Sequence, residues 1–264
     1  MIPLEFMKIS ATGNDFILID NRTCVVNAEK DRQLFQTLCT RRRSVGADGV
    51  ILLQRSDRAD FEYIHINADG SVAEMCGNGT RAIAYFARRL GIVTSFLTFE
   101  IHGQLYRAKI KDKTVTTDFS KPKHTNLTLR IVEHAGLEDG GFIDTGVPHF
   151  VIYCRSVHDL DVDGLGKHYR HHTAFEKGAN IDFVEFMNKN ELRVRTFERG
   201  VERETLACGT GAVAAALVSR QLNRATPLVT LHFPGGDLVV DVDTLDRITL
   251  TGLVEPVYKA LLVE

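Results

Sequence analysis

Short apolar runs dominate the hydrophobic pattern of this chain, and most have the length and the β-branched composition of strands. Runs that predict strands lie at residues 50–53, 61–66 and 97–101 in the first half, and at 150–153, 181–186, 192–197 and 238–242 in the second. Two longer stretches, Thr80 to Leu90 and Ala212 to Leu222, predict helices. Residues 212–218 of the second stretch are apolar on every side, which is typical of a helix buried inside a domain.

The two predicted helices follow two copies of one motif, because C-G-x-G occurs at residues 76–79 and again at 208–211. Three other pairs of segments match in the same order, each separated by about half the chain. These pairs are 12–17 with 145–150, 46–48 with 178–180, and 97–99 with 229–231. Matches at one offset and in one order indicate a duplication.

The duplication and the strand pattern together predict an α+β fold of two pseudo-symmetric domains. We expect each domain to be a mixed, curled β-sheet around a central buried helix, with the active site in the interdomain cleft. The polar segment 121–124 contains Pro122 and reads as a connector. We therefore predict an N-terminal domain at residues 1–124, to which 255–264 return, and a C-terminal domain at 125–254.

Composition and charge exclude several classes of protein. Hydrophobic residues make up 44% of the chain and the net charge is only −2, which favours a globular domain and gives no reason to expect a nucleic-acid partner. The longest apolar run is too short to span a membrane, and the first residues lack the basic start of a signal peptide. The five cysteines are odd in number and widely spaced, so we expect a reduced, cytoplasmic protein without a metal site.

The C-G-x-G positions suggest acid–base chemistry. A cysteine just before a buried helix lies beside free backbone N–H groups that can bind a carboxylate, and the helix dipole favours its thiolate. With one such cysteine in each domain, one thiolate can remove a proton from a carbon while the opposite thiol delivers another to the far face. We predict that Cys76 and Cys208 are this pair, whereas the remaining cysteines, Cys24, Cys39 and Cys154, are inert.

Eight segments in this chain together resemble the diaminopimelate epimerase family. They are Gly13-Asn14-Asp15-Phe16, Gly46-Ala47-Asp48-Gly49, Asn67-Ala68-Asp69-Gly70-Ser71, Met75-Cys76-Gly77-Asn78-Gly79, Pro148-His149, Glu198-Arg199-Gly200, Ala207-Cys208-Gly209-Thr210-Gly211 and His232-Phe233-Pro234-Gly235-Gly236. The match runs from about Met7 to the C-terminus in the order and spacing of the family.

The resemblance implies a homodimeric isomerase that needs neither pyridoxal phosphate nor metal. It would interconvert LL- and meso-diaminopimelate, a small-molecule substrate of lysine and peptidoglycan synthesis. Carried over by position, the catalytic base and acid would be Cys76 and Cys208. The residues implied to bind substrate are Asn14, Asn67, Asn180 and Arg199 at the distal end, Gly77, Asn78, Gly209 and Thr210 at the reacting carboxylate, and Glu198 at the reacting ammonium. Glu198 and His149 would also adjust the thiol pKa values.

Two departures from the family pattern concern the substrate. Many members have His-Gly-Leu where this chain has Ser10-Ala11-Thr12, and many have Asn where this chain has Val147. Because an Asn at that position would contact the distal end of the substrate and Val cannot form a hydrogen bond, the substrate range is open.

Several alternatives remain at this level. A related cofactor-independent racemase would act on another amino acid, such as proline or histidine. A thiol redox enzyme would use a resolving disulfide, and a binding module would hold a carboxylate without catalysis. The cluster His168-Tyr169-Arg170-His171-His172 could suggest a metal site, but we expect it to be a solvated loop.

Overall fold

The computed structural model describes residues 4–73, 75–244 and 247–262, and the chain divides into two compact units. Unit 1 comprises Met1–Thr117 with Gly252–Glu264, and unit 2 comprises Asp118–Thr251. Within the described residues, no helix combines the length and the apolar character that crossing a bilayer would require.

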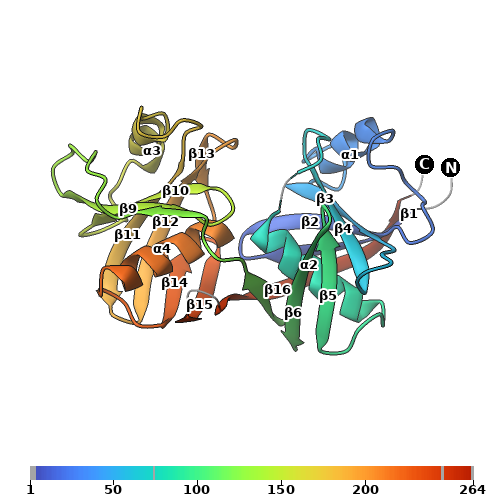
Figure 1. The fold of residues 1–264 in the computed structure, drawn as a ribbon. Helices are drawn as coiled ribbons and strands as arrows, with labels where there is room; N and C mark the ends of the chain where they lie inside the picture. Colours follow the sequence, from blue (N-terminus) through green and yellow to red (C-terminus); the bar gives the residue numbers. More distant parts are fainter. Residues whose placement is uncertain (1–3, 74, 245–246, 263–264) are drawn as a thin grey trace. The chain divides into compact units, whose positions relative to one another are not determined.

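Unit 1 is a curled sheet that surrounds one helix, α2 (Figure 1). Its elements are β1 (Leu4–Ala11), β2 (Asn14–Asp20), α1 (Arg32–Cys39), β3 (Gly49–Gln54), β4 (Phe61–Asn67), α2 (Gly77–Arg89), β5 (Phe96–Ile101), β6 (Gln104–Lys111), β7 (Thr114–Phe119) and the end of β16 (Arg247–Leu262). The strand order runs from β1 to β7 and on to β16, which also pairs with β1. The apolar side chains of α2 therefore pack inside the sheet, against Phe16, Ile51 and Phe99 among others.

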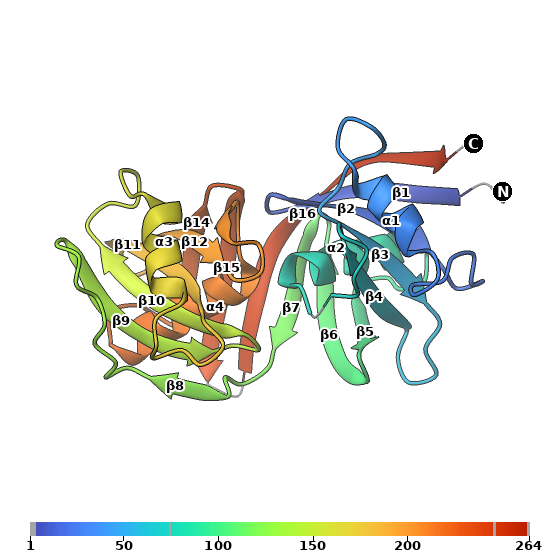
Figure 2. The same cartoon turned by 90° about the horizontal axis from the view of Figure 1, so that it is seen from above.

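Unit 2 repeats this plan around α4 (Figure 2). Its elements are β8 (His124–Asn126), β9 (Leu137–Asp144), β10 (Pro148–Cys154), α3 (Val162–Arg170), β11 (Asn180–Asn188), β12 (Glu191–Glu198), β13 (Arg203–Thr205), α4 (Gly209–Gln221), β14 (Leu228–Phe233), β15 (Gly236–Thr244) and the start of β16. Every residue of α4 from Gly209 to Ser219 is buried, as expected for a helix without a polar face.

The internal topologies of the two units correspond strand by strand. In unit 1, β2 is parallel to β3 and β4 is parallel to β5, and in unit 2 the same holds for β10 with β11 and for β12 with β14. The antiparallel pairs between them also correspond, β3 with β4 and β11 with β12. The predicted α+β fold, with a mixed sheet and a central buried helix in each half, is confirmed.

One local expectation is wrong. The segment 168–172 is not a solvated loop, because residues up to Arg170 form the last turn of α3 and Tyr169 is fully buried. The Tyr169 hydroxyl lies 2.7 Å from Nδ1 of His134. Two glycines made the segment look irregular, but Gly166 lies against the ring of Phe197, where a Cβ would overlap that ring. The glycine thus allows close helix–sheet packing rather than a loop.

Candidate functional site

Cys76 and Cys208 occupy the same structural position, each in its own unit. Each is the N-cap residue of the central helix, in extended conformation, with φ −120° and ψ 117° at Cys76 and φ −126° and ψ 115° at Cys208. Each sulfur accepts a hydrogen bond from a first-turn backbone N–H, from Gly79 at 3.5 Å and from Gly211 at 3.4 Å. The predicted setting, a sulfur at the positive end of a buried helix, is therefore present in both units.

The final glycine of each C-G-x-G motif permits a close approach to the sheet. A Cβ at Gly79 would overlap the hydroxyl oxygen of Tyr63, and a Cβ at Gly211 would overlap Oδ1 of Asp182. Glycine is therefore required in both copies, although the neighbour differs between them.

A chain of buried polar groups leads away from Cys208. Its sulfur lies 3.3 Å from Oγ1 of Thr210, and that oxygen lies 2.9 Å from Nε2 of His149. Nδ1 of His149 lies 2.7 Å from Oδ2 of Asp182, whose other oxygen accepts a hydrogen bond from Thr196 at 2.7 Å. His149 and Asp182 are both completely buried, so this polar chain is shielded from solvent.

Burial raises the pKa of the Cys208 thiol well above its usual value, and the nearby carboxylates of Glu198 and Asp182 raise it further. The hydrogen bonds from Thr210 and from the Gly211 amide act in the opposite direction but are outweighed. The helix N-terminus was expected to favour a thiolate, yet at Cys208 desolvation and negative neighbours prevail. This group is therefore a thiol at neutral pH.

Three other predicted residues gather near Cys208 in unit 2. Asn180 begins β11, and its Oδ1 accepts a hydrogen bond from the backbone N–H of Arg199 at 2.7 Å. Its amide nitrogen donates to the Pro148 carbonyl at 2.9 Å, which is adjacent to His149. Within the described part of the chain, the Arg199 guanidinium has no hydrogen bond or ion pair, so its forked donors are available for a carboxylate. Glu198 ends β12 directly before it.

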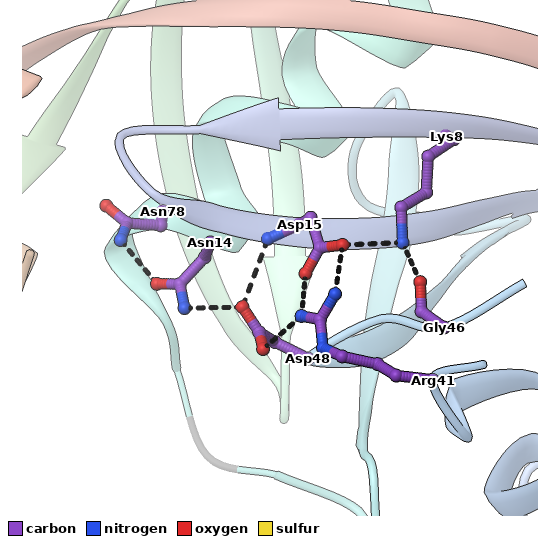
Figure 3. Close-up of polar contacts among 7 residues, drawn as sticks. All are labelled: Lys8, Asn14, Asp15, Arg41, Gly46, Asp48 and Asn78. Carbon is purple, nitrogen blue, oxygen red and sulfur yellow. Dashed lines mark hydrogen bonds and ion pairs between the residues drawn. The ribbon is translucent and has the colours of Figure 1, made fainter. Parts of the chain in front are cut away.

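Asn14 and Asn78 meet in unit 1. Nδ2 of Asn78 donates to Oδ1 of Asn14 at 2.6 Å, and Nδ2 of Asn14 donates to Oδ2 of Asp48 at 2.9 Å (Figure 3). Asp48 also accepts a hydrogen bond from the Asp15 backbone N–H and pairs with Arg41 at 2.9 Å. Both amide side chains are thus fixed in orientation before any ligand binds.

Ion pairs of Asp15 with two basic side chains lie beside these amide contacts (Figure 3). Asp15 pairs with Arg41 and, at 2.8 Å, with Lys8, which also donates to the Gly46 carbonyl. Burial alone would raise the pKa of Asp15, but the contacts with Arg41 and Lys8 outweigh it and lower that pKa. Asn67 stands apart from the network, since its amide donates to Ser71 Oγ at 3.0 Å, at the end of β4.

Cys39 and Cys154 differ from this pair in position, because Cys39 ends α1 and Cys154 ends β10 and neither caps the N-terminus of a helix. All five cysteines are free thiols. Burial raises the pKa of both Cys39 and Cys154 to about 11, as it also raises the pKa of Cys208. Across residues 4–73, 75–244 and 247–262, no cluster of three or more His, Cys, Asp or Glu side chains could hold a metal ion.

Sequence reasoning missed three polar residues that the structure connects to these sites: Asp48, Arg81 and Asp182. Two of them carried a signal, because Asp182 interrupts a predicted buried strand and Arg81 lies on the buried face of a helix rich in alanine. A charge at a position that the pattern assigns to the core calls for a partner or a function. Asp48, in a Gly-rich segment, had the appearance of an ordinary turn residue.

Known proteins resemble this chain in sequence and in fold. The family model for diaminopimelate epimerase matches residues 6–125 and 141–256. A diaminopimelate epimerase of Aquifex aeolicus is 40% identical, with 99% of this chain and 98% of that protein covered. Among solved structures, a phenazine biosynthesis protein of the PhzF family from Bacillus anthracis has a TM-score of 0.76 at 14% identity, with both chains fully covered.

A hydroxyproline epimerase from Agrobacterium vitis, solved with trans-4-hydroxy-L-proline, has a TM-score of 0.69 at 15% identity, with 98% of this chain and 92% of that chain covered. At such identities, the two solved structures show a shared fold. The family model and the Aquifex protein go further and confirm the resemblance that the sequence motifs predicted. This chain belongs to the diaminopimelate epimerase family.

Proposed function

We propose that this protein is a diaminopimelate epimerase that interconverts LL- and meso-2,6-diaminopimelate, in lysine and peptidoglycan biosynthesis. One observation carries the proposal, and it occurs in both units. In each, a cysteine that forms no disulfide caps a buried helix, and its sulfur lies at the first-turn amides. Two such groups are what inversion by two bases requires, because a proton leaves one face of the carbon and another arrives at the opposite face.

In the proposed reaction, the Cys76 thiolate removes the α-proton and the Cys208 thiol protonates the opposite face. The elevated pKa of Cys208 supports its role as the acid, because it arrives at the reaction with its proton. Backbone N–H groups at Gly77, Asn78, Gly209 and Thr210 would bind the reacting carboxylate, where negative charge builds up during proton removal. For the reverse reaction, the two sulfurs exchange roles.

The remaining predicted residues would recognise the rest of the substrate. Asn14, Asn67, Asn180 and Arg199 would bind the distal amino-acid end, with the Arg199 guanidinium pairing to its carboxylate. Glu198 would bind the reacting ammonium group. Glu198 and His149 would also adjust the thiol pKa values, which agrees with the part that Glu198 has in raising the pKa of Cys208.

The decisive test replaces each cysteine separately. Cys76→Ser and Cys208→Ser should both lose epimerisation of LL-diaminopimelate by at least about 100-fold, because each face of the carbon needs its own group. Epimerisation and the uptake of solvent deuterium at the α-carbon are measured together, with Cys154→Ser as the matched control. A Cys76→Ser or Cys208→Ser enzyme that epimerised at the wild-type rate would contradict the proposal.

Val147 favours one second candidate, a cofactor-independent racemase of a different amino acid. Its side chain cannot form the hydrogen bond that an Asn would offer to a distal amino-acid end. Deuterium uptake should be compared for LL-diaminopimelate, proline, 4-hydroxyproline and histidine. Exchange with a single-ended amino acid and none with diaminopimelate would establish this alternative.

We also propose that the protein is a cytoplasmic homodimer, as the family resemblance implies. Supporting this, β16 carries exposed apolar side chains at Leu253, Val257 and Leu261, which are 49%, 58% and 48% exposed. Light scattering of the wild-type protein and of Val257→Glu should give a dimer and a weakened dimer, respectively. A monomeric wild-type protein would overturn this part of the proposal.

A further inference from the structure

Arg81 is the largest fully buried side chain among the described residues, with no exposed surface. It lies in α2, one turn after Cys76, among the alanines that pack inside the sheet of unit 1. Removing a guanidinium from water is costly unless an anion compensates for its charge. The position of Arg81 therefore needs a physical explanation.

All the hydrogen-bond acceptors of Arg81 are neutral. Nη1 donates to the Gly77 carbonyl at 3.0 Å, and Nη2 donates to Oγ1 of Thr12 at 3.0 Å and to Oδ1 of Asn78. Nε has no partner. Within the described part of the chain, no carboxylate pairs with this guanidinium, and the one charge interaction that it makes is with Cys76.

Burial lowers the pKa of Arg81 to about 10, and the interaction with Cys76 acts in the opposite direction. Arg81 is thus still a cation at neutral pH. Electrostatic coupling is reciprocal, so a cation that is stabilised by a nearby thiolate stabilises that thiolate equally.

Unit 2 has an apolar residue, Val213, at the equivalent place in α4, and this side chain is also fully buried. The charged groups that act on Cys208 are instead the carboxylates Glu198 and Asp182. The two cysteines therefore share one backbone geometry, but the cation that interacts with Cys76 has no counterpart at the equivalent position of α4.

Arg81 also orders the polar groups around the helix N-terminus. By taking Oδ1 of Asn78, it leaves the Nδ2 of that residue to donate to Asn14. Its bond to Thr12 stabilises a tight turn between β1 and β2, in which Thr12 has φ 48° and Gly13 has φ 87°. A positive φ is unfavourable for a β-branched residue, so this hydrogen bond compensates for local strain next to Asn14.

We propose that Arg81 is a positioning residue that holds Cys76 as the thiolate in the resting enzyme and fixes the orientation of Asn78 toward Asn14. The duplication thereby produced two sites with different starting protonation, a base in unit 1 and an acid in unit 2. The naming of base and acid rests on the proposed function. The electrostatic role of Arg81 does not.

The test measures the pH dependence of alkylation at Cys76 by iodoacetamide, with each cysteine followed separately by peptide mass spectrometry. The variants are Arg81→Met, which removes the charge, Arg81→Gln, which keeps hydrogen-bond donors without charge, and Arg81→Lys, which keeps the charge. Arg89→Met, on the exposed end of the same helix, is the matched control for loss of a cation. Surface-exposed Cys24 is the internal reference for reagent reactivity.

Arg81→Met and Arg81→Gln should move the midpoint of Cys76 alkylation upward by about 1 to 3 pH units, the usual effect of losing a close opposite charge. The Cys76 midpoint of Arg81→Lys should lie close to that of the wild-type protein, and the midpoint of Arg89→Met should equal it. Equal midpoints for Arg81→Gln and Arg89→Met would overturn the proposal. If the uncharged variants fail to fold, a wild-type Cys76 midpoint that is no lower than that of the same residue in the urea-unfolded chain would overturn the proposal.

Turnover distinguishes this inference from the proposed function. If Arg81→Gln shifts the Cys76 midpoint as expected but the wild-type protein does not epimerise diaminopimelate, the proposed function is disproved and the role of Arg81 stands. If the wild-type protein is a fully active epimerase but Arg81→Gln leaves the midpoint unchanged, the function stands and the role of Arg81 is disproved. In an active enzyme, Arg81→Lys should raise KM more than it lowers kcat, since its single ammonium cannot hold Thr12, Gly77 and Asn78 together.

Discussion

The hydroxyl oxygen of Thr210 lies 3.3 Å from the Cys208 sulfur and is also within hydrogen-bond distance of His149 Nε2. Because a carboxylate oxygen accepts, Nδ1 of His149 donates to Asp182, which turns Nε2 toward Thr210. The single hydroxyl proton of Thr210 can be donated either to Nε2 or to the Cys208 sulfur. One hydroxyl thus connects the proposed acid to a buried imidazole whose orientation the carboxylate fixes.

Thr210→Val should lower kcat about tenfold with little change in KM, because valine keeps the shape and loses the hydroxyl, and one hydrogen bond corresponds to about 1.4 kcal/mol. Steady-state kinetics with LL-diaminopimelate measures the effect. Thr114→Val, at an exposed position of β7, is the control. An unchanged kcat in Thr210→Val would show that the Thr210 hydroxyl does not contribute to catalysis.

Glu198→Gln should move the alkaline limb of the kcat profile to lower pH. The Glu198 carboxylate raises the pKa of the Cys208 thiol, so its neutralisation lowers that pKa and the acid is lost earlier as pH rises. The profile of Glu191→Gln, at the other end of β12, should match that of wild type. If the alkaline limb of Glu198→Gln stays in place or moves to higher pH, the Glu198 carboxylate does not raise the pKa of the Cys208 thiol.

Gly79→Ala should destabilise the protein by about 1 to 3 kcal/mol, because the added methyl meets the Tyr63 hydroxyl in a fully packed core. Tyr63→Phe removes that hydroxyl, which has no partner within the described structure, and should cost little alone. In the double variant the two losses should not add, since the methyl gains room. Urea unfolding of all four proteins measures the coupling, and additive losses would contradict it.

The protein should lose stability as pH falls from about 6.5 toward 4, through His65. Both ring nitrogens of this buried side chain lack a partner within the described structure, and desolvation lowers its pKa to about 4. A depressed histidine pKa means that the unfolded chain takes up the proton first, so folding is favoured above that range and weakened within it.

The full effect of His65 corresponds to about 3 kcal/mol in the free energy of unfolding. His65→Phe should reduce the acid loss, which urea unfolding at several pH values will show. His102→Phe, at an exposed histidine, should retain the wild-type dependence. An acid loss of wild-type size in His65→Phe would exclude this residue as its source.

Much of the fold follows from local pattern, but the polar partners do not. The all-apolar face of α4 and the repeated C-G-x-G motif suffice to predict a buried helix capped by cysteine in each half. Each helix in fact begins at the glycine after the cysteine, three residues before the apolar pattern starts. The capping turn is polar or glycine-rich, so hydrophobic periodicity does not reveal it.

Contacts between distant segments were not predictable in the same way. Thr210, His149 and Asp182 come from α4, β10 and β11, and only the strand register brings them together. Similarly, nothing local to Arg81 shows that its partner Thr12 lies in the turn between β1 and β2. The length of β16 was also hidden, because Glu255, Pro256 and Lys259 interrupt its apolar alternation.

Strand β16 has a consequence for how the protein is made. Residues 254–262 of β16 pair with β1, so the unit that leaves the ribosome first contains a strand whose neighbour is synthesised only after all of unit 2. The sheet of unit 1 therefore cannot be completed until residues 252–262 have emerged, by which time all of unit 2 has been made. A chain cut after Thr251 would retain every residue of the later unit and lack the closing strand of the earlier one.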